Sequence, residues 1–279
     1  MSFFNKYLAA TKKNESYVCV GLDSDITKLP SIVKTESNPL LVFNKRIIDE
    51  THQYVACYKI NMAFYLALGG DGVEVVKKTI EYIPDNIPVI IDIKAGDIGN
   101  TMEQYAFSVF RYFKADAMTI NILMGSDVVN ACFTIEDSFC FALVLTSNPS
   151  AKQYFTHNDL YKKLAIIVNK FGHERIGAVV GATRSDDFNE LRELMPETIF
   201  LIPGVGAQGG DLNSVCENAI YTKDDARILV NSSRAIIYAN STDRYAETAG
   251  KEAKLLRERI TELIGNETGL WQKRKRHHL

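Results

Sequence analysis

Eight short apolar runs alternate with longer amphipathic stretches along most of the sequence. This alternation is typical of repeated βα units around a parallel sheet. The runs are nearly all apolar, as expected for strands that are covered on both faces. Eight such units predict a closed (β/α)8 TIM barrel. The expected strands lie at residues 17–23, 56–64, 88–94, 117–122, 139–147, 177–183, 199–206 and 226–234.

The length of the chain fits one domain of this kind. A chain of 279 residues with 46% hydrophobic residues can bury a large core, and α/β barrels reach this size as single domains. We expect residues 1–265 to form one catalytic TIM-barrel domain, closed by an amphipathic helix at about 243–264. The basic tail at 266–279, which ends in KRKRHHL, is expected to be a disordered extension without a targeting or nucleic-acid-binding role.

Charge and cysteine content limit the partners and the compartment. Lys and Arg total 32 against 34 Asp and Glu, and the net charge of −2 gives no bulk attraction to nucleic acid or to an acidic membrane. The sequence shows no secretory apolar region and no apolar run of membrane-spanning length. Five cysteines without C-x-x-C spacing fit a reducing compartment. We therefore expect a cytoplasmic protein that acts on a small molecule.

Polar side chains gather where the expected strands end. The C-terminal ends of the strands form the mouth of a TIM barrel, and barrels of this kind place their active sites there. The sequence therefore predicts one functional mouth to which several strands contribute. The polar residues at these ends are Asp23, Lys59, Asp92, Lys94, Asn121, Ser147, Thr183 and Arg234.

The segment PVIIDIKAGDIGNT (88–101) carries the strongest chemical signal. Regular alternation along a strand places Asp92 and Lys94 on the same face. Asp97 follows in a loop, from which it either turns back to the same site or reaches a neighbouring subunit. Lys59 ends another apolar strand, and a buried ammonium group there implies a carboxylate partner. The alternative is a structural ion-pair network at the strand ends.

A second signal follows the seventh and eighth expected strands. The segment LIPGVGAQGGD (201–211) is rich in glycine and contains Gln208, and glycines let backbone N–H groups approach an anion closely. Arg234 ends the eighth strand, and its guanidinium group can bind phosphate through two parallel hydrogen bonds. TIM barrels often bind phosphate in this region. The alternatives are an ordinary flexible loop and an arginine that pairs with a surface carboxylate.

Two further positions allow both functional and structural interpretations. Asp23 can accept a hydrogen bond from a sugar hydroxyl, or it can cap the segment that follows. Ser147 in TSNPSA (146–151) can bind the edge of an amide-like ring, or it can belong to a turn before Pro149. The sequence contains no metal-ligand spacing and no nucleotide-cofactor motif, so we expect neither a metal nor a cofactor.

Taken together, these segments resemble the orotidine 5′-phosphate decarboxylase family, specifically its branch of longer microbial-type chains. They span nearly the whole chain and are specific as a set. The resemblance implies a cofactor-free TIM barrel that converts orotidine 5′-phosphate to uridine 5′-phosphate and CO₂, in the last step of de novo pyrimidine nucleotide synthesis. The segments are VCVGLD (18–23), YKINMAFY (58–65), DIKAGDIGNT (92–101), LTSNPSA (145–151), VVGAT (179–183), PGVGAQGGD (203–211) and NSSRAIIYA (231–239).

The resemblance also implies catalytic roles for individual residues. Lys59, Asp92, Lys94 and Asp97 would form the alternating charged tetrad of the family. Lys94 would protonate C6 of the pyrimidine. Asp97 and Thr101 would be contributed across the interface of a homodimer.

By the same resemblance, other residues would bind the substrate. Asp23 would bind the ribose, and Ser147 would bind the pyrimidine. Gln208 and Arg234 would bind the phosphate. Two positions depart from the pattern of this branch, which commonly has Arg where this chain has Ala95 and usually Pro where it has Ile60. Neither replaces a tetrad residue, so these departures bear on local loop geometry and rate rather than on the type of reaction.

Other functions remain open from the sequence. A Schiff-base aldolase would use Lys59 or Lys94 as its nucleophile, but the lysine pKa must then be lowered, whereas Asp92 and Asp97 nearby would raise it. A barrel that only binds a phosphate ligand would be expected to lack a tetrad residue, and none is missing. A metal-assisted sugar-phosphate reaction would be abolished by chelators.

Overall fold

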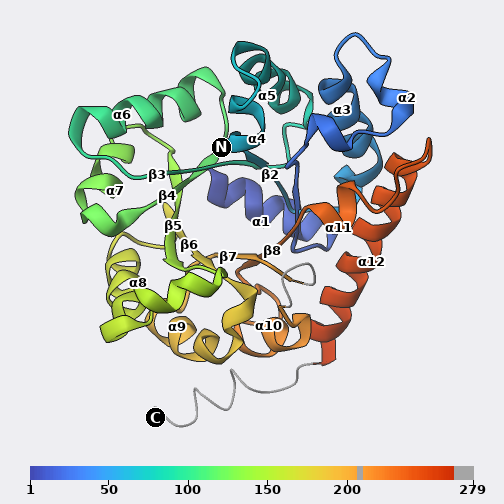
Figure 1. The fold of residues 1–279 in the computed structure, drawn as a ribbon. Coiled ribbons are helices and arrows are strands. Elements are labelled where there is room, and N and C mark those ends of the chain that lie inside the picture. The colour runs from blue at the N-terminus through green and yellow to red at the C-terminus, as the bar shows by residue number, and fades with distance from the viewer. Residues whose placement is uncertain (206–209, 267–279) are drawn as a thin grey trace.

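Eight parallel strands close into a barrel in the order of the sequence, and β8 pairs with β1 (Figure 1). The computed structural model describes residues 1–205 and 210–266, without the side chains of 184–186 and 266. The predicted (β/α)8 fold is confirmed. The strands are β1 (Val18–Gly21), β2 (Cys57–Asn61), β3 (Val89–Ala95), β4 (Ala117–Ile120), β5 (Phe139–Leu145), β6 (Ile176–Val180), β7 (Phe200–Pro203) and β8 (Ile228–Ser232).

Helices form an outer ring around the barrel (Figure 1). The helix predicted at about 243–264 is α12 (Tyr245–Asn266), which packs against α3, α10 and α11. Within the described residues, no helix has the length and apolar character needed to span a membrane. The other α-helices are α1 (Phe3–Asn14), α2 (Ser31–Lys34), α3 (Pro39–Thr51), α4 (Met62–Leu66), α5 (Gly70–Tyr82), α6 (Gly99–Phe107), α7 (Asp127–Cys132), α8 (Leu160–Lys170), α9 (Phe188–Leu194), α10 (Leu212–Asn218) and α11 (Arg234–Ile237).

Several strands are shorter than the apolar runs that predict them. The run at 56–64 stops being a strand at Asn61, whose Oδ1 accepts a hydrogen bond from the N–H of Ala63 and so caps α4. The run at 139–147 stops being a strand at Leu145. Apolar residues continue past the end of β2, as Met62, Ala63 and Phe64 show, so composition alone does not mark where that strand ends.

Helix α1 closes the N-terminal end of the barrel. Phe3 is almost fully buried, and its ring centroid lies 4.5 Å from that of Phe139 and 5.3 Å from that of Phe141 on β5. The hydroxyl of Tyr7, which is also buried, donates a hydrogen bond to the carbonyl oxygen of Ile228 at 3.2 Å. The interior is thereby packed from this end, which we call the floor.

Inward-pointing residues of the strands change from apolar to polar toward the other end. Residues in the lower part of the barrel belong to one buried apolar cluster that includes Cys57, Ile90, Ala117 and Leu229. Successive inward positions on a strand are two residues apart. The next inward residues above these four line a cavity at the mouth, and they are Lys59, Asp92, Thr119 and Asn231.

Candidate active site

A cavity of about 390 Å³ lies at the C-terminal ends of the strands. Its charged wall comes from β1 to β3, and its apolar wall comes from β5 to β7 through Leu143, Val179 and Leu201. This volume is within the range of small-molecule sites, in which a few polar groups orient a ligand against apolar surface. Six residues predicted from the sequence line this cavity, namely Asp23, Lys59, Asp92, Lys94, Ser147 and Arg234.

Lys59 on β2 is a buried ammonium group held between two carboxylates. Its side chain is only 5% exposed, and its Nζ lies 3.3 Å from Asp23 Oδ1 and 3.2 Å from Asp92 Oδ2. Burial alone would lower the pKa of Lys59, but the carboxylates of Asp23 and Asp92 outweigh burial and raise the pKa above its usual value. Lys59 therefore stays protonated and fixes the positions of both carboxylates.

Asp92 on β3 is the centre of the charged array. Its Oδ1 accepts hydrogen bonds from Lys94 Nζ at 2.6 Å and from Thr119 Oγ1 at 2.8 Å, while its Oδ2 faces Lys59. Burial would raise the pKa of Asp92, but the ammonium groups of Lys59 and Lys94 outweigh it and lower the pKa to about 2. Asp92 is therefore a carboxylate at neutral pH.

Lys94 reaches Asp92 through an irregular backbone rather than through regular alternation. Its φ of 50° lies in the left-handed region, and the register between β3 and β4 shifts between Ile91 and Ala95. The sequence therefore predicts the contact between Asp92 and Lys94 correctly, but the regular alternation on which that prediction relied does not hold in this segment. The side chain of Lys94 is 50% exposed, so its ammonium group contacts both Asp92 and the open cavity.

Arg234 lines the same cavity as the lysines, at the start of α11. Its side chain is exposed, and within the part of the chain that the structure describes it makes no ion pair or side-chain hydrogen bond. The two ends of the neighbouring glycine-rich loop are joined by a hydrogen bond from Gly210 N to Gly204 O at 3.1 Å. Gln208 lies outside the described residues, so its contact with phosphate stays a prediction.

Ser147 follows β5 and is positioned by a close backbone approach. A Cβ on Gly181 would lie 2.6 Å from Ser147 Cα, so only glycine fits beside it. The hydroxyl of Thr183 donates a hydrogen bond to the carbonyl oxygen of Ser147 at 3.0 Å. Thr183 thus contacts a residue of the cavity wall but is not itself among the lining residues, although the sequence places it at the mouth.

Asp97 and Thr101 are not among the residues that line the cavity. Asp97 lies in the loop between β3 and α6, where its Oδ1 accepts a hydrogen bond from the N–H of Ile98 at 2.8 Å. Thr101 is exposed on the first turns of α6. The structure of one chain thus brings six of the nine predicted site residues together but leaves these two outside and Gln208 undescribed.

Some polar residues of the cavity are missing from the sequence predictions, among them Asn61, Thr119 and Asn231. Asn231 is 8% exposed, and its Oδ1 has no hydrogen-bond partner among the described residues. Thr119 and Asn231 each lie two residues after an inward apolar residue, so counting inward positions along each strand would have found them. Asn121, which the sequence places at the mouth, instead accepts a hydrogen bond from Leu123 N.

A closed (β/α)8 barrel with a lysine–carboxylate array at its mouth belongs to the class of TIM-barrel enzymes. Within that class, a family model described as orotidine 5′-phosphate decarboxylase / HUMPS matches residues 16–249. The chain therefore belongs to the orotidine 5′-phosphate decarboxylase / HUMPS family.

Curated proteins and solved structures agree with this assignment. The chain is 42% identical to an orotidine 5′-phosphate decarboxylase of Christiangramia forsetii over 89% of this chain and 93% of that relative. It is 38% identical to a protein of the same name from Porphyromonas gingivalis, over 89% and 92% of the two chains. The crystal structure of a putative orotidine-monophosphate-decarboxylase from Toxoplasma gondii superposes with a TM-score of 0.85 at 34% identity. The match covers 95% of this chain and 97% of that chain. The structure of Leishmania donovani OMP decarboxylase superposes with a TM-score of 0.79 at 29% identity, covering 95% and 100%.

Proposed function

We propose that this protein is a carboxy-lyase that converts orotidine 5′-phosphate to uridine 5′-phosphate and CO₂, without a cofactor, in the last step of de novo pyrimidine nucleotide synthesis. Lys94 donates the proton that replaces the carboxylate at C6. Family membership and the names of the relatives support the substrate. The observation that carries the role of Lys94 is its ammonium group, 2.6 Å from the Asp92 carboxylate on the wall of the cavity.

The chemical step requires a cation at the carbon that loses CO₂. The bond between C6 and the carboxylate carbon breaks, and its electron pair stays on C6, where the pyrimidine offers no conventional electron sink. Lys94 Nζ stabilises this charge and transfers its proton to C6, after which the neutral amine regains a proton from water. Enzymes near the top of the usual range lower such barriers by about 23 kcal/mol. One hydrogen bond contributes far less, so the whole charged array must act together.

The carboxylate of Asp92 contributes a second effect, which is repulsion of the substrate carboxylate. Asp92 stays ionised because Lys59 and Lys94 lower its pKa. A substrate carboxylate bound beside it experiences like-charge repulsion that disappears when CO₂ departs. In the proposal, Asp97 of a second subunit adds a further carboxylate at the same place.

Groups distant from C6 hold the substrate. Asp23 contacts the ribose, Ser147 the pyrimidine edge, and Arg234 together with Gln208 the phosphate. The guanidinium group of Arg234 is exposed and has no ion-pair partner among the described residues, which supports this assignment. Binding energy at the phosphate can organise the charged array and exclude water, which lowers the barrier rather than only tightening binding.

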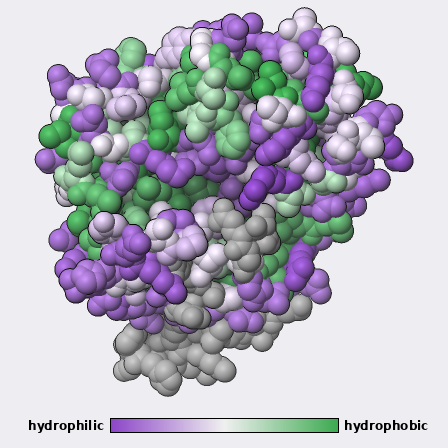
Figure 2. Space-filling view, in the orientation of Figure 1, coloured by the Kyte–Doolittle hydropathy of each residue, from purple (hydrophilic) through white to green (hydrophobic). Residues whose placement is uncertain are grey.

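We propose that the active enzyme is a homodimer in which Asp97 and Thr101 complete the partner's cavity. Several apolar side chains on α4, α6 and the segments beside them are exposed, and Figure 2 shows hydrophobic residues over the region of α4 to α7. Single exposed apolar residues are normal on a monomer, whereas a group of them favours an interface. The residues of this group are Phe64, Leu66, Ile98, Tyr105, Phe107, Leu123 and Met124.

The remaining expectations belong to the same proposal. Residues 1–265 form the catalytic domain, and the basic tail takes no part in the reaction. The enzyme works in the cytoplasm on its small-molecule substrate, without nucleic acid or membrane partners. The near balance of charges, with a net charge of −2, supports a freely diffusing enzyme.

The decisive test follows the absorbance of orotidine 5′-phosphate after addition of purified protein, with excess chelator present and Lys94→Ala as the control. We expect rapid, chelator-resistant conversion to uridine 5′-phosphate that disappears in Lys94→Ala. No conversion by the unmutated protein would refute the proposal. Among the residues that the structure describes, no three His, Cys, Asp or Glu side chains group as metal ligands, and the chelator tests metal dependence directly.

The aldolase alternative is disfavoured at one of its two lysines. A Schiff base needs a neutral amine, and the carboxylates of Asp23 and Asp92 raise the pKa of Lys59. Borohydride treatment with a carbonyl substrate would trap a lysine adduct if this alternative were correct. Binding of a phosphate ligand without turnover would instead identify a binding protein.

A further inference from the structure

The two strands that carry and support the lysine–carboxylate pair are not matched residue for residue. Ile91 pairs with Met118 and Ala95 pairs with Ile120, so the segment 92–94 of β3 faces the single residue Thr119 of β4. Extra residues of this kind bend a strand and redirect its side chains, and they are common next to active sites. Both Asp92 and Lys94 lie inside the irregular segment.

The hydroxyl group of Thr119 replaces the missing part of the backbone ladder. Its Oγ1 accepts hydrogen bonds from the N–H groups of Ile93 at 3.0 Å and Lys94 at 2.9 Å. Because a hydroxyl oxygen has two acceptor lone pairs and one proton, these bonds leave only its proton available. That proton is donated to Asp92 Oδ1 at 2.8 Å. The residue is 1% exposed, so water cannot readily take over these three bonds.

The same contacts hold Lys94 in an unfavourable backbone conformation. A lysine with φ of 50° is uncommon, and such conformations persist where surrounding structure enforces them. Here the N–H of Lys94 is bound by Thr119, and the side chain returns to Asp92 Oδ1, the oxygen that Thr119 also contacts. One buried hydroxyl group thus determines the position of both members of the pair.

We propose that Thr119 is a positioning residue for the reaction: its hydroxyl group holds the backbone of Lys94 and the carboxylate of Asp92 so that the Lys94 ammonium group faces the reacting carbon. This inference rests on the proposed decarboxylase function for its kinetic effect. Its structural part, that the hydroxyl group enforces the geometry of Lys94, stands independently.

The test compares Thr119→Val, which keeps the shape but removes the hydroxyl group, with Thr119→Ser, which keeps the hydroxyl group. We expect kcat for orotidine 5′-phosphate to fall about 10²-fold in Thr119→Val, the size of loss caused by small misplacement of a catalytic group. We expect KM to change little, because the ribose, pyrimidine and phosphate contacts are intact. Thr119→Ser should restore most of the lost kcat.

The matched control is Thr51→Val, which removes another fully buried hydroxyl group far from the mouth. Thr51 Oγ1 donates to Ile47 O and contacts the hydroxyl of Tyr58, both at 2.6 Å. This variant should lose stability, as Thr119→Val should, but keep kcat. An equal loss of kcat in Thr119→Val and Thr119→Ser, or an unchanged kcat in Thr119→Val, would overturn the proposal.

Crystal structures of both variants separate this inference from the proposed activity. Thr119→Val should lose the left-handed conformation of Lys94 and its contact with Asp92, whereas Thr119→Ser should keep both. If Thr119→Val does not fold, Thr119→Ala provides the same comparison with less steric demand. Unchanged Lys94 geometry without the hydroxyl group would refute the inference even if the enzyme is active, and absent turnover in the unmutated protein would refute only the proposed function.

Discussion

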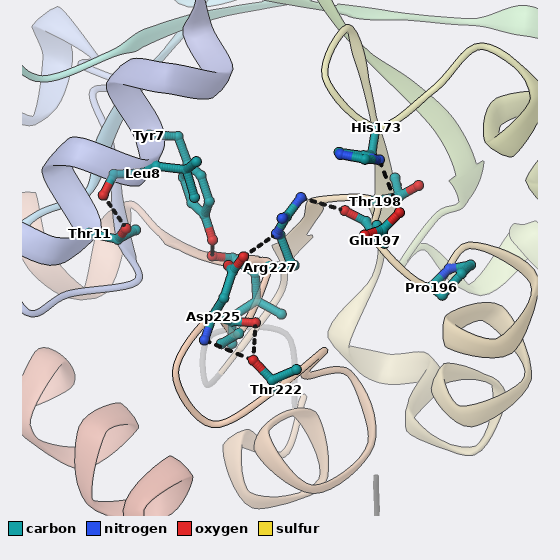
Figure 3. A network of polar contacts seen from close by, with 12 residues as sticks. Tyr7, Leu8, Thr11, His173, Pro196, Glu197, Thr198, Thr222, Asp225 and Arg227 are labelled. Atoms are coloured by element: carbon teal, nitrogen blue, oxygen red, sulfur yellow. Dashed lines mark hydrogen bonds and ion pairs between the residues drawn. The ribbon is translucent and has the colours of Figure 1, made fainter. Parts of the chain in front are cut away.

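At the floor of the barrel Arg227 is enclosed by protein partners, whereas at the mouth Lys94 and Arg234 direct their charges toward a cavity. Arg227 lies between the carboxylate of Asp225 and the backbone carbonyl oxygen of Glu197, close to the Tyr7 hydroxyl of α1 (Figure 3). Its guanidinium carbon also lies 4.9 Å from the ring centroid of Phe4.

The difference shows how one fold divides stability from chemistry. The floor residues satisfy one another and are covered by α1, so they have little left to offer a ligand. The mouth residues Lys59, Asp92 and Lys94 are paired as well, but their pairs border the cavity. In TIM barrels the mouth is the catalytic end and the floor contributes to stability. Substitutions at the two ends should therefore affect different measurements.

The largest effect is expected for Lys94→Ala at the mouth. We expect kcat to fall by about 10⁴-fold, at the upper end of general acid catalysis, because in the proposed mechanism the same ammonium group also stabilises charge at C6. The free energy of unfolding should change by less than about 1 kcal/mol, since the side chain is half exposed. Steady-state kinetics and urea denaturation test the two parts. A variant with most of its kcat intact would show that another group donates the proton.

Arg234→Ala should weaken the use of the phosphorylated substrate. Loss of two charge-assisted hydrogen bonds of about 1.5 kcal/mol each corresponds to a fall of about 10²-fold in kcat/KM. Orotidine, which lacks the phosphate, serves as the control substrate and should react equally slowly with both proteins. An equal loss with both substrates would place Arg234 outside the phosphate site.

Asp92 should make stability depend on pH in the acid range. Its pKa is about 2 in the folded protein, against an ordinary value of 3.8. Because the folded-state pKa is lowered, the stabilisation is present above about pH 4 and is lost as the pH falls toward 2, and it amounts to about 2 kcal/mol. The difference in unfolding free energy between the unmutated protein and Asp92→Asn should therefore shrink between pH 6 and pH 3.

Urea denaturation at several pH values measures this difference. Asp85→Asn, which changes an exposed carboxyl group before β3, is the matched control and should show no such trend. A constant difference for Asp92→Asn over the same range would mean that Asp92 does not gain its stabilisation from Lys59 and Lys94.

The features that the sequence predicted correctly are those that depend on the residue pattern within a single strand. Eight apolar runs predict eight strands, and parallel strands bring Asp23, Lys59, Asp92 and Arg234 to one mouth because their C-terminal ends meet there. The N-terminal helix was not predicted as the floor, although Phe3, Phe4 and Tyr7 have the spacing of an apolar helix face.

What the sequence did not predict depends on contacts between strands. The irregular segment at 92–94 exists because Thr119 on a neighbouring strand binds its N–H groups, and no pattern within β3 contains that information. Asp97 and Thr101 do not line the cavity of this chain, and their contribution across a homodimer interface stays a prediction of the resemblance.

The smallest effect is expected for Tyr7→Phe at the floor. The change removes one buried hydrogen bond to Ile228 O and keeps the ring, so the free energy of unfolding should fall by about 1 kcal/mol. Because β8 continues from Ile228 to Asn231 at the mouth, this variant also tests whether the two ends are independent. We expect kcat and KM to be unchanged. A loss of kcat in fully folded Tyr7→Phe would show that floor packing positions the mouth, and the division between the two ends would then be wrong.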